Sequence, residues 1–339
     1  MKVEDIKRDC IMIDVRSPGE YEDGTIPGAI NIPIFDDEER AVIGTLYKKV
    51  GTREAKKRGI EIVSSKLSDI YSKVEQHDIK GRDMVLFCSK GGMRSGSLVQ
   101  LLKALGHRVE QLEGGYKAYR RYILDNLGGL IRGKNVVVIH GNTGVGKTEI
   151  LKRLEKEGFP SVDLEEMANS RGSIFGTVGL GKARGQRDFD ALLYDRLRDI
   201  DADYIIVESE SPRVGRVYLP NELVEGMKTG IHLLVECSEQ TRITRIVNEY
   251  IKIQSSEALA EIQDSINRLE GEIGRKKTAE LLGLLEEKKY REVVRILLED
   301  HYDPKYRHSE KKYDYDLTLS SENIDDCVCR IMNYLRQNL

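Results

Sequence analysis

The chain has 339 residues, of which 40% are hydrophobic and 33% charged, the balance of a globular protein with two or three domains. No run approaches the roughly 18 apolar residues of a membrane helix, and the start MKVEDIK lacks a signal peptide's apolar core, so we expect a cytoplasmic protein with no membrane partner. A net charge of −3 leaves a nucleic-acid partner open, and five scattered cysteines do not suit a disulfide framework.

The first third of the chain alternates short apolar runs with helical stretches. Residues 11–15 and 84–87 are typical of buried strands, and the second run ends at Cys88. Leucines at helical spacing between residues 95 and 105 predict a helix after it. A strand, a loop and a helix in this order predict an α/β sheet with its site at the carboxyl end of the strand. We assign this first domain to residues 1–125.

The second domain is assigned to residues 126–238, after a boundary at the glycines of 126–130. Three apolar runs predict its buried strands: residues 135–140, 204–208 and 231–236. The remainder, residues 239–339, is highly charged and helical in pattern, and residues 324–339 predict a closing helix. The overall expectation is an α/β chain whose helical C-terminal region packs on the second domain.

Cys88 opens a loop that reads Cys-Ser-Lys-Gly-Gly-Met-Arg-Ser. Backbone N–H groups in such a loop and the following helix N-terminus form an anion cradle that also lowers a thiol pKa. We therefore predict Cys88 and Arg94 as catalytic residues, the thiolate attacking an anionic donor; this requires the thiol to be reachable. The remaining cradle residues are Ser89, Lys90, Gly91, Gly92 and Met93. A lone cysteine after a strand is otherwise more often structural.

A glycine-rich loop follows the run 135–140 and fits G-x-x-x-x-G-K-[ST], with a helix predicted after it. This pattern is called the P-loop, and its residues here are Gly141, Asn142, Thr143, Gly144, Val145, Gly146, Lys147 and Thr148. The backbone amides would surround a di- or triphosphate, Lys147 would neutralise it, and Thr148 would hold Mg²⁺ if a metal is used. Asp163 and Glu208 form no strong Walker B pattern, so the loop could grip a pyrophosphate ester other than ATP.

Three spaced segments resemble rhodanese domains: 14–21 (DVRSPGEY), 24–33 (GTIPGAINIP) and 112–120 (LEGGYKAYR). This resemblance implies a rhodanese-like first domain. Thr25 stands where rhodaneses usually carry His, and we interpret it as fold support. Arg94 follows Cys88 by six positions, one more than in many small sulfurtransferases. That loop length also resembles dual-specificity phosphatases.

The combination resembles the tRNA 2-selenouridine synthases through residues 35–48, the cysteine loop, residues 163–176 and residues 208–215. The resemblance implies replacement of the sulfur of wobble 2-thiouridine in tRNA by selenium from selenophosphate, through a geranylated intermediate made from geranyl diphosphate. It implies no tightly bound cofactor, Mg²⁺ as an optional ion, and a donor delivered by its own synthase. Cys88 would carry the selenium as Cys–S–Se⁻, and the P-loop would bind the prenyl diphosphate.

Other polar residues are candidates for contacts. Those for substrate or metal are Asp163, Arg171, Ser173, Glu208 and Glu210, and those for tRNA are Lys182, Arg184, Arg187, Arg213 and Arg216. The basic residues of 275–291 alternate with Glu and predict a solvated helix face. Cys327 and Cys329 lack a second pair at suitable spacing, so no metal site is predicted.

Two alternatives stay open at this point. The first is a cysteine-dependent phosphatase or sulfurtransferase whose P-loop is a regulatory nucleotide sensor. The second is a non-catalytic, nucleotide-dependent sulfur-relay or binding module. Hydrolysis of a generic phosphomonoester would favour the first, and nucleotide binding with an inert Cys88 the second.

Overall fold

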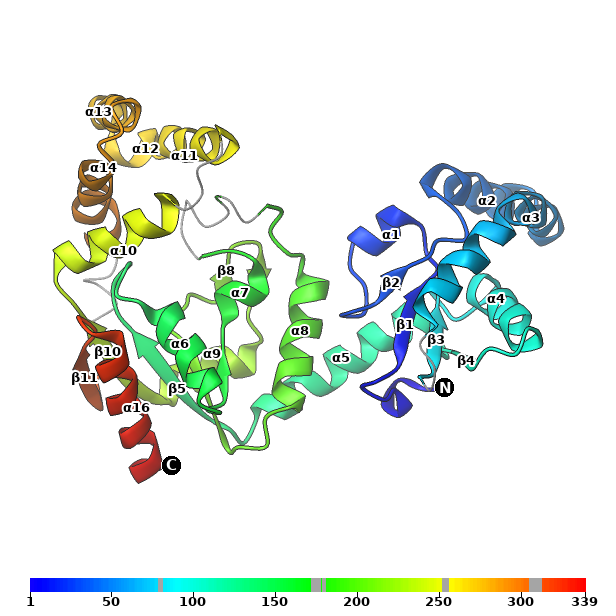
Figure 1. Ribbon diagram of the computed structural model, residues 1–339, viewed down its shortest axis with the longest axis horizontal. Helices are drawn as coiled ribbons and strands as arrows, with labels where there is room; N and C mark the ends of the chain where they lie inside the picture. Colours follow the sequence, from blue (N-terminus) through cyan, green and yellow to red (C-terminus); the bar gives the residue numbers. More distant parts are fainter. Residues whose placement is uncertain (79–81, 172–177, 179–180, 252–255, 305–312) are drawn as a thin grey trace. The chain divides into compact units, whose positions relative to one another are not determined.

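The computed structural model describes the chain except for residues 79–81, 172–177, 179–180, 252–255 and 305–312. The chain divides into two compact units. The first comprises Met1–Leu127 with Arg187–Tyr194, and the second Gly128–Gln186 with Asp195–Leu339. Each contains a parallel sheet with helices around it, which confirms the predicted α/β class (Figure 1).

The sheet of the first unit has four parallel strands in the order β2-β1-β3-β4. Its strands are β1 (Ile11–Asp14), β2 (Ile30–Asn31), β3 (Met84–Phe87) and β4 (Val109–Gln111). Every residue of β1 and β3 is buried, as expected for central parallel strands covered on both faces. Because the strands are parallel, their carboxyl ends meet at one edge, where β3 leads into Cys88 and β4 ends at Gln111.

The helices of the first unit are η1 (Val3–Asp5), α1 (Pro18–Glu22), α2 (Asp37–Lys49), α3 (Thr52–His77), α4 (Met93–Ala104) and α5 (Gly115–Ile131). The predicted helix after the cysteine loop is confirmed as α4. The glycines of 126–130 do not form a break, because α5 continues through Gly128 and Gly129. The two units divide between Leu127 and Gly128, inside this helix.

The second unit has a five-stranded parallel sheet in the order β11-β10-β5-β7-β6. Its strands are β5 (Asn135–His140), β6 (Ser161–Val162), β7 (Tyr204–Glu208), β10 (Ile231–Glu236) and β11 (Leu317–Ser320). The three predicted strands are confirmed as β5, β7 and β10. The C-terminal region is helical as predicted, but it also contributes a strand that was not predicted, β11, which pairs with β10 at the sheet edge. A short antiparallel pair, β8 (Arg213–Val214) and β9 (Val217–Tyr218), lies outside this sheet.

The helices of the second unit fall into two groups. Those next to a strand in the chain are α6 (Lys147–Lys156), α7 (Leu164–Ala168), α8 (Gln186–Arg198, shared with the first unit), α9 (Asn221–Thr229), α10 (Glu239–Ile251) and α16 (Ile324–Asn338). Those between α10 and β11 are α11 (Ser256–Arg268), α12 (Glu270–Ile273), α13 (Arg275–Glu286), α14 (Tyr290–Leu297) and the π-helix η2 (Leu298–Tyr302). Helices α6 and α16 pack together over the sheet, and α11, α13 and α14 share a core of their own.

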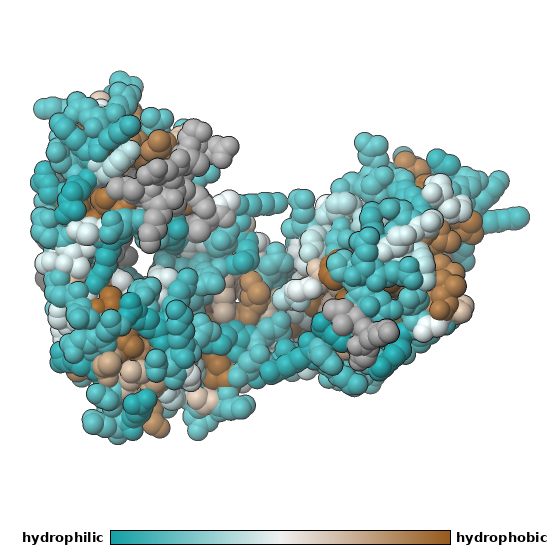
Figure 2. Space-filling view, in the orientation of Figure 1, coloured by the Kyte–Doolittle hydropathy of each residue, from teal (hydrophilic) through white to brown (hydrophobic). Residues whose placement is uncertain are grey.

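No helix in the described part of the chain combines the length and apolar character needed to cross a membrane. Figure 2 shows hydrophilic residues over most of the face in view, with apolar residues in scattered patches.

Candidate functional site

Cys88 lies directly after β3, beneath the N-terminus of α4. Its Sγ accepts hydrogen bonds from the backbone N–H of Gly92 and from the hydroxyl of Ser95, both at 3.3 Å. Burial alone would raise the pKa of the thiol, but hydrogen bonds from the Ser95 side chain and from the backbone of Ser95, Lys90 and Gly92 outweigh it and lower the pKa below its usual value. The loop therefore favours a thiolate at Cys88.

The sulfur is covered rather than open. Cys88 exposes only 3% of its surface and packs with the core of the first unit. Lys90, Gly92 and Met93 in the same loop are exposed, so the covering layer is a surface loop on one side. A donor of phosphate size therefore needs a displacement of this loop to reach the sulfur.

Glycines hold the loop in shape where side chains would collide with the backbone. Gly91 has φ +59°, and a Cβ there would lie 2.6 Å from the carbonyl oxygen of Leu112. A Cβ on Gly115, at the start of α5, would lie 2.1 Å from the carbonyl oxygen of Cys88. The next N–H along α5, that of Tyr116, donates to this same carbonyl at 2.9 Å. The segment 112–120, matched to rhodaneses in the sequence, thus braces the base of the cysteine loop.

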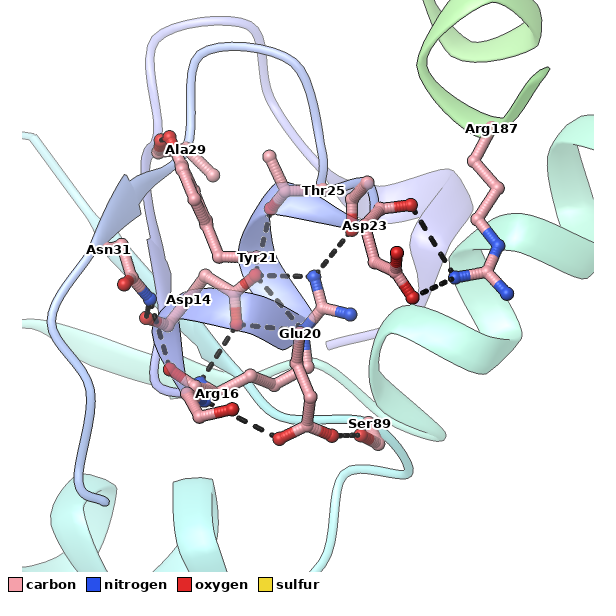
Figure 3. Close-up of polar contacts among 12 residues, drawn as sticks. Asp14, Arg16, Glu20, Tyr21, Asp23, Thr25, Ala29, Asn31, Ser89 and Arg187 are labelled. Carbon is pink, nitrogen blue, oxygen red and sulfur yellow. Dashed lines mark hydrogen bonds and ion pairs between the residues drawn. The ribbon is translucent and has the colours of Figure 1, made fainter. Parts of the chain in front are cut away.

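Arg94 reaches across the loop to an acidic partner. Its Nη1 donates to Glu20 Oε2 at 2.5 Å and its Nη2 to Ser89 Oγ at 2.9 Å. The Ser89 hydroxyl donates to the other oxygen of Glu20 at 2.7 Å, a contact drawn in Figure 3. Burial would raise the pKa of Glu20, but the hydrogen bonds from Arg94 and Ser89 lower it to about 2. The predicted cradle cation is thus at the loop, and its charge is compensated by Glu20.

A second buried ion pair fixes the first motif of the chain. Arg16 Nη2 lies 2.6 Å from Asp14 Oδ2, with both side chains almost fully buried. The Thr25 hydroxyl donates to the same oxygen at 2.8 Å, as Figure 3 shows, and Arg16 lies over the ring of Tyr116 at 4.1 Å. This pair locks the loop after β1, and Thr25 supports it, which agrees with the interpretation of Thr25 as fold support.

The glycine-rich loop follows β5 and leads into α6, which confirms the predicted strand–loop–helix context. Gly144 and Gly146 have φ +86° and +96°, the left-handed conformation that favours glycine. A Cβ on Gly141 would lie 2.3 Å from the carbonyl oxygen of Val235. Lys147 Nζ donates to the carbonyl oxygen of Gly141 at 2.7 Å, so its ammonium group folds back over the loop.

Residues from the C-terminal part hold the glycine-rich loop, and sequence reasoning did not single them out. Arg242 Nε donates to the Thr143 carbonyl at 2.8 Å, and Arg245 Nη1 donates to the Val145 carbonyl at 2.8 Å. The Ser321 hydroxyl donates to that same Val145 carbonyl at 2.8 Å. The only sequence signal was two arginines three positions apart at the start of a helix after a strand, which is also typical of a solvated helix.

Four carboxyl groups lie at the carboxyl ends of β6 and β7, those of Asp163, Glu165, Glu208 and Glu210. Lys147 acts on two of them, Glu165 and Glu210. Burial and the neighbouring Glu210, opposed by Lys147, raise the pKa of Glu165 to about 8. Burial, and to a lesser extent the nearby negative charge of Asp163, raise the pKa of Glu208 well above its usual value. Glu165 and Glu210 are also hydrogen-bond partners through their side chains. The cluster therefore carries protons near neutral pH.

Profiles of two protein families match the chain. A profile described as the tRNA 2-selenouridine synthase AAA domain matches residues 134–338, and one described as a Rhodanese-like domain matches residues 2–122. The chain belongs to the tRNA 2-selenouridine synthase family. The two matched segments contain the P-loop and the cysteine loop respectively.

Curated relatives named tRNA 2-selenouridine synthase extend along most of the chain. The protein of Sulfurovum sp. (strain NBC37-1) is 32% identical, over 87% of each chain. That of Shewanella pealeana is 32% identical over 89% of each, and that of Pseudomonas savastanoi pv. phaseolicola is 31% identical over 97% of this chain and 95% of its own. A solved N-terminal domain of a putative ATP/GTP binding protein from Clostridium difficile 630 is 46% identical, covers 37% of this chain and 98% of its own, and has a TM-score of 0.35.

Two buried carboxylate oxygens in this synthase-family chain are candidate ligands for a metal ion. Oδ2 of Asp163 and Oε2 of Glu208 have no hydrogen-bond partner within the described structure. Over the same residues no group of three or more His, Cys, Asp or Glu is arranged to hold a metal by itself. A magnesium ion bound mainly by phosphates and water needs only one or two protein oxygens. The orphaned oxygens thus fit a magnesium ion at the P-loop.

The cysteines of the C-terminal helix do not face one another in a shared environment. Cys327 is buried in the core under α16, and burial raises the pKa of its thiol to about 11, whereas Cys329 is exposed. Cys237 is half-buried, and burial raises its pKa as well. Among the cysteine thiols, a lowered pKa is found for Cys88.

The remaining predicted residues of the synthase-family chain lie on loops and at element ends. Arg171 is ion-paired with Glu249 at 2.8 Å, and Arg184 Nη1 donates to the Glu166 carbonyl at 2.5 Å. Exposed basic residues are Lys182, Arg213 and Arg216 in the second unit and Arg187 in the first, where Arg187 contacts Asp23 (Figure 3). Ser173 lies outside the described residues.

Proposed function

We propose that this protein is a tRNA 2-selenouridine synthase that replaces the sulfur of wobble 2-thiouridine by selenium. Its support is membership of that family together with two anion sites on one chain, a cysteine loop with a lowered thiol pKa and a P-loop. The observation that carries the proposal is Cys88, whose sulfur accepts two hydrogen bonds in an anion-binding loop.

The first step we assign to the P-loop, with geranyl diphosphate as co-substrate. The thiocarbonyl sulfur attacks the first carbon of the geranyl group, the carbon–oxygen bond breaks, diphosphate leaves, and the uridine loses its N3 proton. Loop amides and Lys147 would hold the diphosphate, because backbone N–H groups and an ammonium are its natural partners. Magnesium, if bound, would neutralise diphosphate charge beside Thr148, Asp163 and Glu208. ATP in this loop is the alternative occupant.

The second step we assign to Cys88 and selenophosphate. Selenium in this donor is already at the selenide level, so a Cys–S–Se⁻ carrier with departing phosphate would require a two-electron oxidant. The balanced step is attack of the thiolate on phosphorus: the S–P bond forms, the P–Se bond breaks, and hydrogen selenide leaves with the electron pair. Selenide then displaces the geranylthio group, and water hydrolyses the phosphocysteine. The loop length shared with dual-specificity phosphatases favours binding of a phosphoryl group.

Labelled donor distinguishes the two roles of Cys88. Selenophosphate carrying radioactive phosphorus should leave label on Cys88 in a rapidly quenched reaction, and donor carrying radioactive selenium should not. Retention of selenium label without phosphorus label would support the carrier role and contradict attack on phosphorus. Label on neither, with selenouridine formed, would remove covalent catalysis by Cys88.

Transfer RNA is the proposed macromolecular partner. Lys182, Arg187, Arg213 and Arg216 are exposed and suited to phosphate contacts, and two of them also have partners within the fold: Arg187 pairs with Asp23, and Arg213 donates to the Gly215 carbonyl. Arg171 and Arg184 are less exposed and are also engaged within the fold. Binding through phosphates predicts an affinity for tRNA that falls steeply with salt. A flat salt response would contradict these contacts. Delivery of selenophosphate by its synthase would appear as a complex of the two proteins.

A cysteine-dependent phosphatase is the second candidate, favoured by the six-position spacing of Cys88 and Arg94. Hydrolysis of a generic aryl phosphate, lost in Cys88→Ala, would support it. Co-purified tRNA and formation of selenouridine by the intact protein would support the synthase.

A further inference from the structure

Gln111 joins the end of β4 to the cysteine loop. Its Nε2 lies 3.1 Å from the carbonyl oxygen of Gly92 and 2.9 Å from Oγ of Ser95. Both partners belong to the residues that surround the sulfur of Cys88, which itself lies 3.3 Å from Ser95 Oγ. Three side chains from β4, α4 and the end of β3 thus form one hydrogen-bonded row.

The direction of this row follows from hydrogen-bond chemistry. The Gly92 carbonyl can only accept, so the Gln111 atom that faces it must be the amide nitrogen. The second proton of that nitrogen is then available to Ser95 Oγ. A hydroxyl that accepts from Gln111 keeps its single proton for another acceptor, and the Cys88 sulfur is the acceptor within reach. Ser95 is fully buried, so bulk water does not compete for this proton.

The neighbouring helix leaves space for the glutamine. Gly96 lies inside α4, where glycine is less favourable than alanine by about 1 kcal/mol. A Cβ at this position would lie 3.3 Å from Nε2 of Gln111 and 3.4 Å from its Oε1. Glycine at position 96 therefore allows the amide to lie against the helix and reach Ser95.

We propose that Gln111 is a positioning residue for the nucleophile, which orients the Ser95 hydroxyl so that its proton points at the sulfur of Cys88. The inference rests on the proposed role of Cys88 as nucleophile. Gln111 touches neither donor nor tRNA in this scheme, and acts only through Ser95. Loss of the amide would leave the hydroxyl free to turn toward the Gly92 carbonyl and away from the sulfur.

The test is the ionisation of Cys88 in the full-length protein, measured without donor or tRNA. Ultraviolet thiolate absorbance is titrated against pH, with the matching Cys88→Ala protein subtracted. Ser95→Ala should raise the thiol pKa by about one unit, since a hydrogen bond to a charged group is lost. Gln111→Leu should raise it by roughly half a unit. Gln100→Leu, the same change at an exposed site on α4, should leave it unchanged.

The double variant, Gln111→Leu in the Ser95→Ala protein, shows whether Gln111 acts on the sulfur through Ser95. If Gln111 acts through Ser95, Gln111→Leu should cause no further pKa shift in the Ser95→Ala protein. A shift of the same size in both backgrounds, or no shift in either, would overturn the proposal. Gln111→Glu gives a second approach that keeps the side-chain length, because the introduced carboxylate can only accept and should turn the Ser95 proton away, raising the thiol pKa more than Gln111→Leu does.

The outcome is separable from that of the proposed function. A thiol pKa that responds to Gln111 through Ser95 supports the positioning role even if selenium transfer is absent. Conversely, selenouridine formation that depends on Cys88, together with a thiol pKa that does not respond to Gln111, would retain the proposed function and contradict the positioning role.

Discussion

Arg94 and Glu20 form an ion pair across the cysteine loop, with Nη1 2.5 Å from Oε2. Glu20 also accepts from Ser89 and lies 3.3 Å from Arg40, so one carboxylate ties both ends of the loop to α1 and α2. An incoming anion must therefore compete with Glu20 for the guanidinium. The loop is preorganised by a group that also limits the positive charge open to a donor.

Replacement of Glu20 should separate these two effects. Glu20→Gln should lower the free energy of unfolding by roughly 1 kcal/mol, a value reduced by the partial exposure of the pair. It should also lower the KM for selenophosphate, because Arg94 loses its competing charge. Urea unfolding measures the change in the free energy of unfolding, and initial rates at varied selenophosphate concentration measure the change in KM. Glu61→Gln, in an exposed pair with Arg58, is the control and should change stability by less than about 0.5 kcal/mol.

The acid dependence of this pair has a defined sign. The pKa of Glu20 is about 2 in the folded chain, below its ordinary 4.5. Its stabilisation is thus present above pH 4.5 and lost as pH falls through about 2. The stability difference between wild type and Glu20→Gln should shrink over this window in acid unfolding. A difference that does not vary with pH would show that the charge of Glu20 is unimportant.

Coverage of the Cys88 sulfur predicts slow modification despite its lowered pKa. Iodoacetamide at pH about 7 should label Cys329 first, because that residue is exposed. Unfolding in urea should abolish the protection of Cys88. Peptide mass spectrometry follows each cysteine separately. Equal labelling rates for the two residues in the native protein would mean that the loop opens readily in solution.

Proton linkage should identify what binds at the P-loop. The pKa of Glu165 is about 8, and the pKa of the neighbouring Glu210 is also raised. The negative charge of bound diphosphate should therefore drive proton uptake by these carboxyl groups. Diphosphate without metal should then bind more weakly as pH rises from about 6 to 9. Magnesium should act in the opposite sense and release protons. Calorimetry in two buffers with different ionisation heats measures this linkage, and proton release on metal-free diphosphate binding would contradict it.

A matched pair of glycine substitutions, one in the P-loop and one before α3, tests the P-loop backbone. Gly141 and Gly51 have φ +145° and +136°, but a Cβ would meet the Val235 carbonyl at Gly141 and nothing within 4 Å at Gly51. Both alanine variants incur backbone strain, and Gly141→Ala should lose a further 1–3 kcal/mol or so from overpacking. Diphosphate affinity should fall only in Gly141→Ala. Equal stability in denaturant titrations would contradict the close approach.

Much of the central architecture was predictable from local sequence. Strands β3 and β5 are continuous apolar runs followed by loops with distinctive composition, so periodicity and motif agree. Strand β11 was missed because its four residues lie at a sheet edge with one buried side chain, Leu319, and produce little periodic signal. The glycines in α5 were interpreted as a break, whereas tertiary packing keeps the helix continuous through them.

The supporting contacts of both sites were less accessible to sequence reasoning. Arg242 and Arg245 hold the P-loop from about 100 residues away in sequence, and only the fold reveals that they point inward. Gln111 meets Ser95 because β4 pairs with β3, a register that no local pattern encodes. The residues proposed to carry chemistry lie in recognisable motifs, whereas the residues that contact and support them do not.

The most direct measurement is mass spectrometry of wobble nucleosides after 2-thiouridine tRNA is incubated with geranyl diphosphate and selenophosphate. Wild type should form 2-selenouridine, Cys88→Ala should stop at the geranylated nucleoside, and Lys147→Ala should leave 2-thiouridine unchanged. Selenouridine formed by Cys88→Ala at the wild-type rate, or normal geranylation by Lys147→Ala, would contradict the assignment of one step to each site.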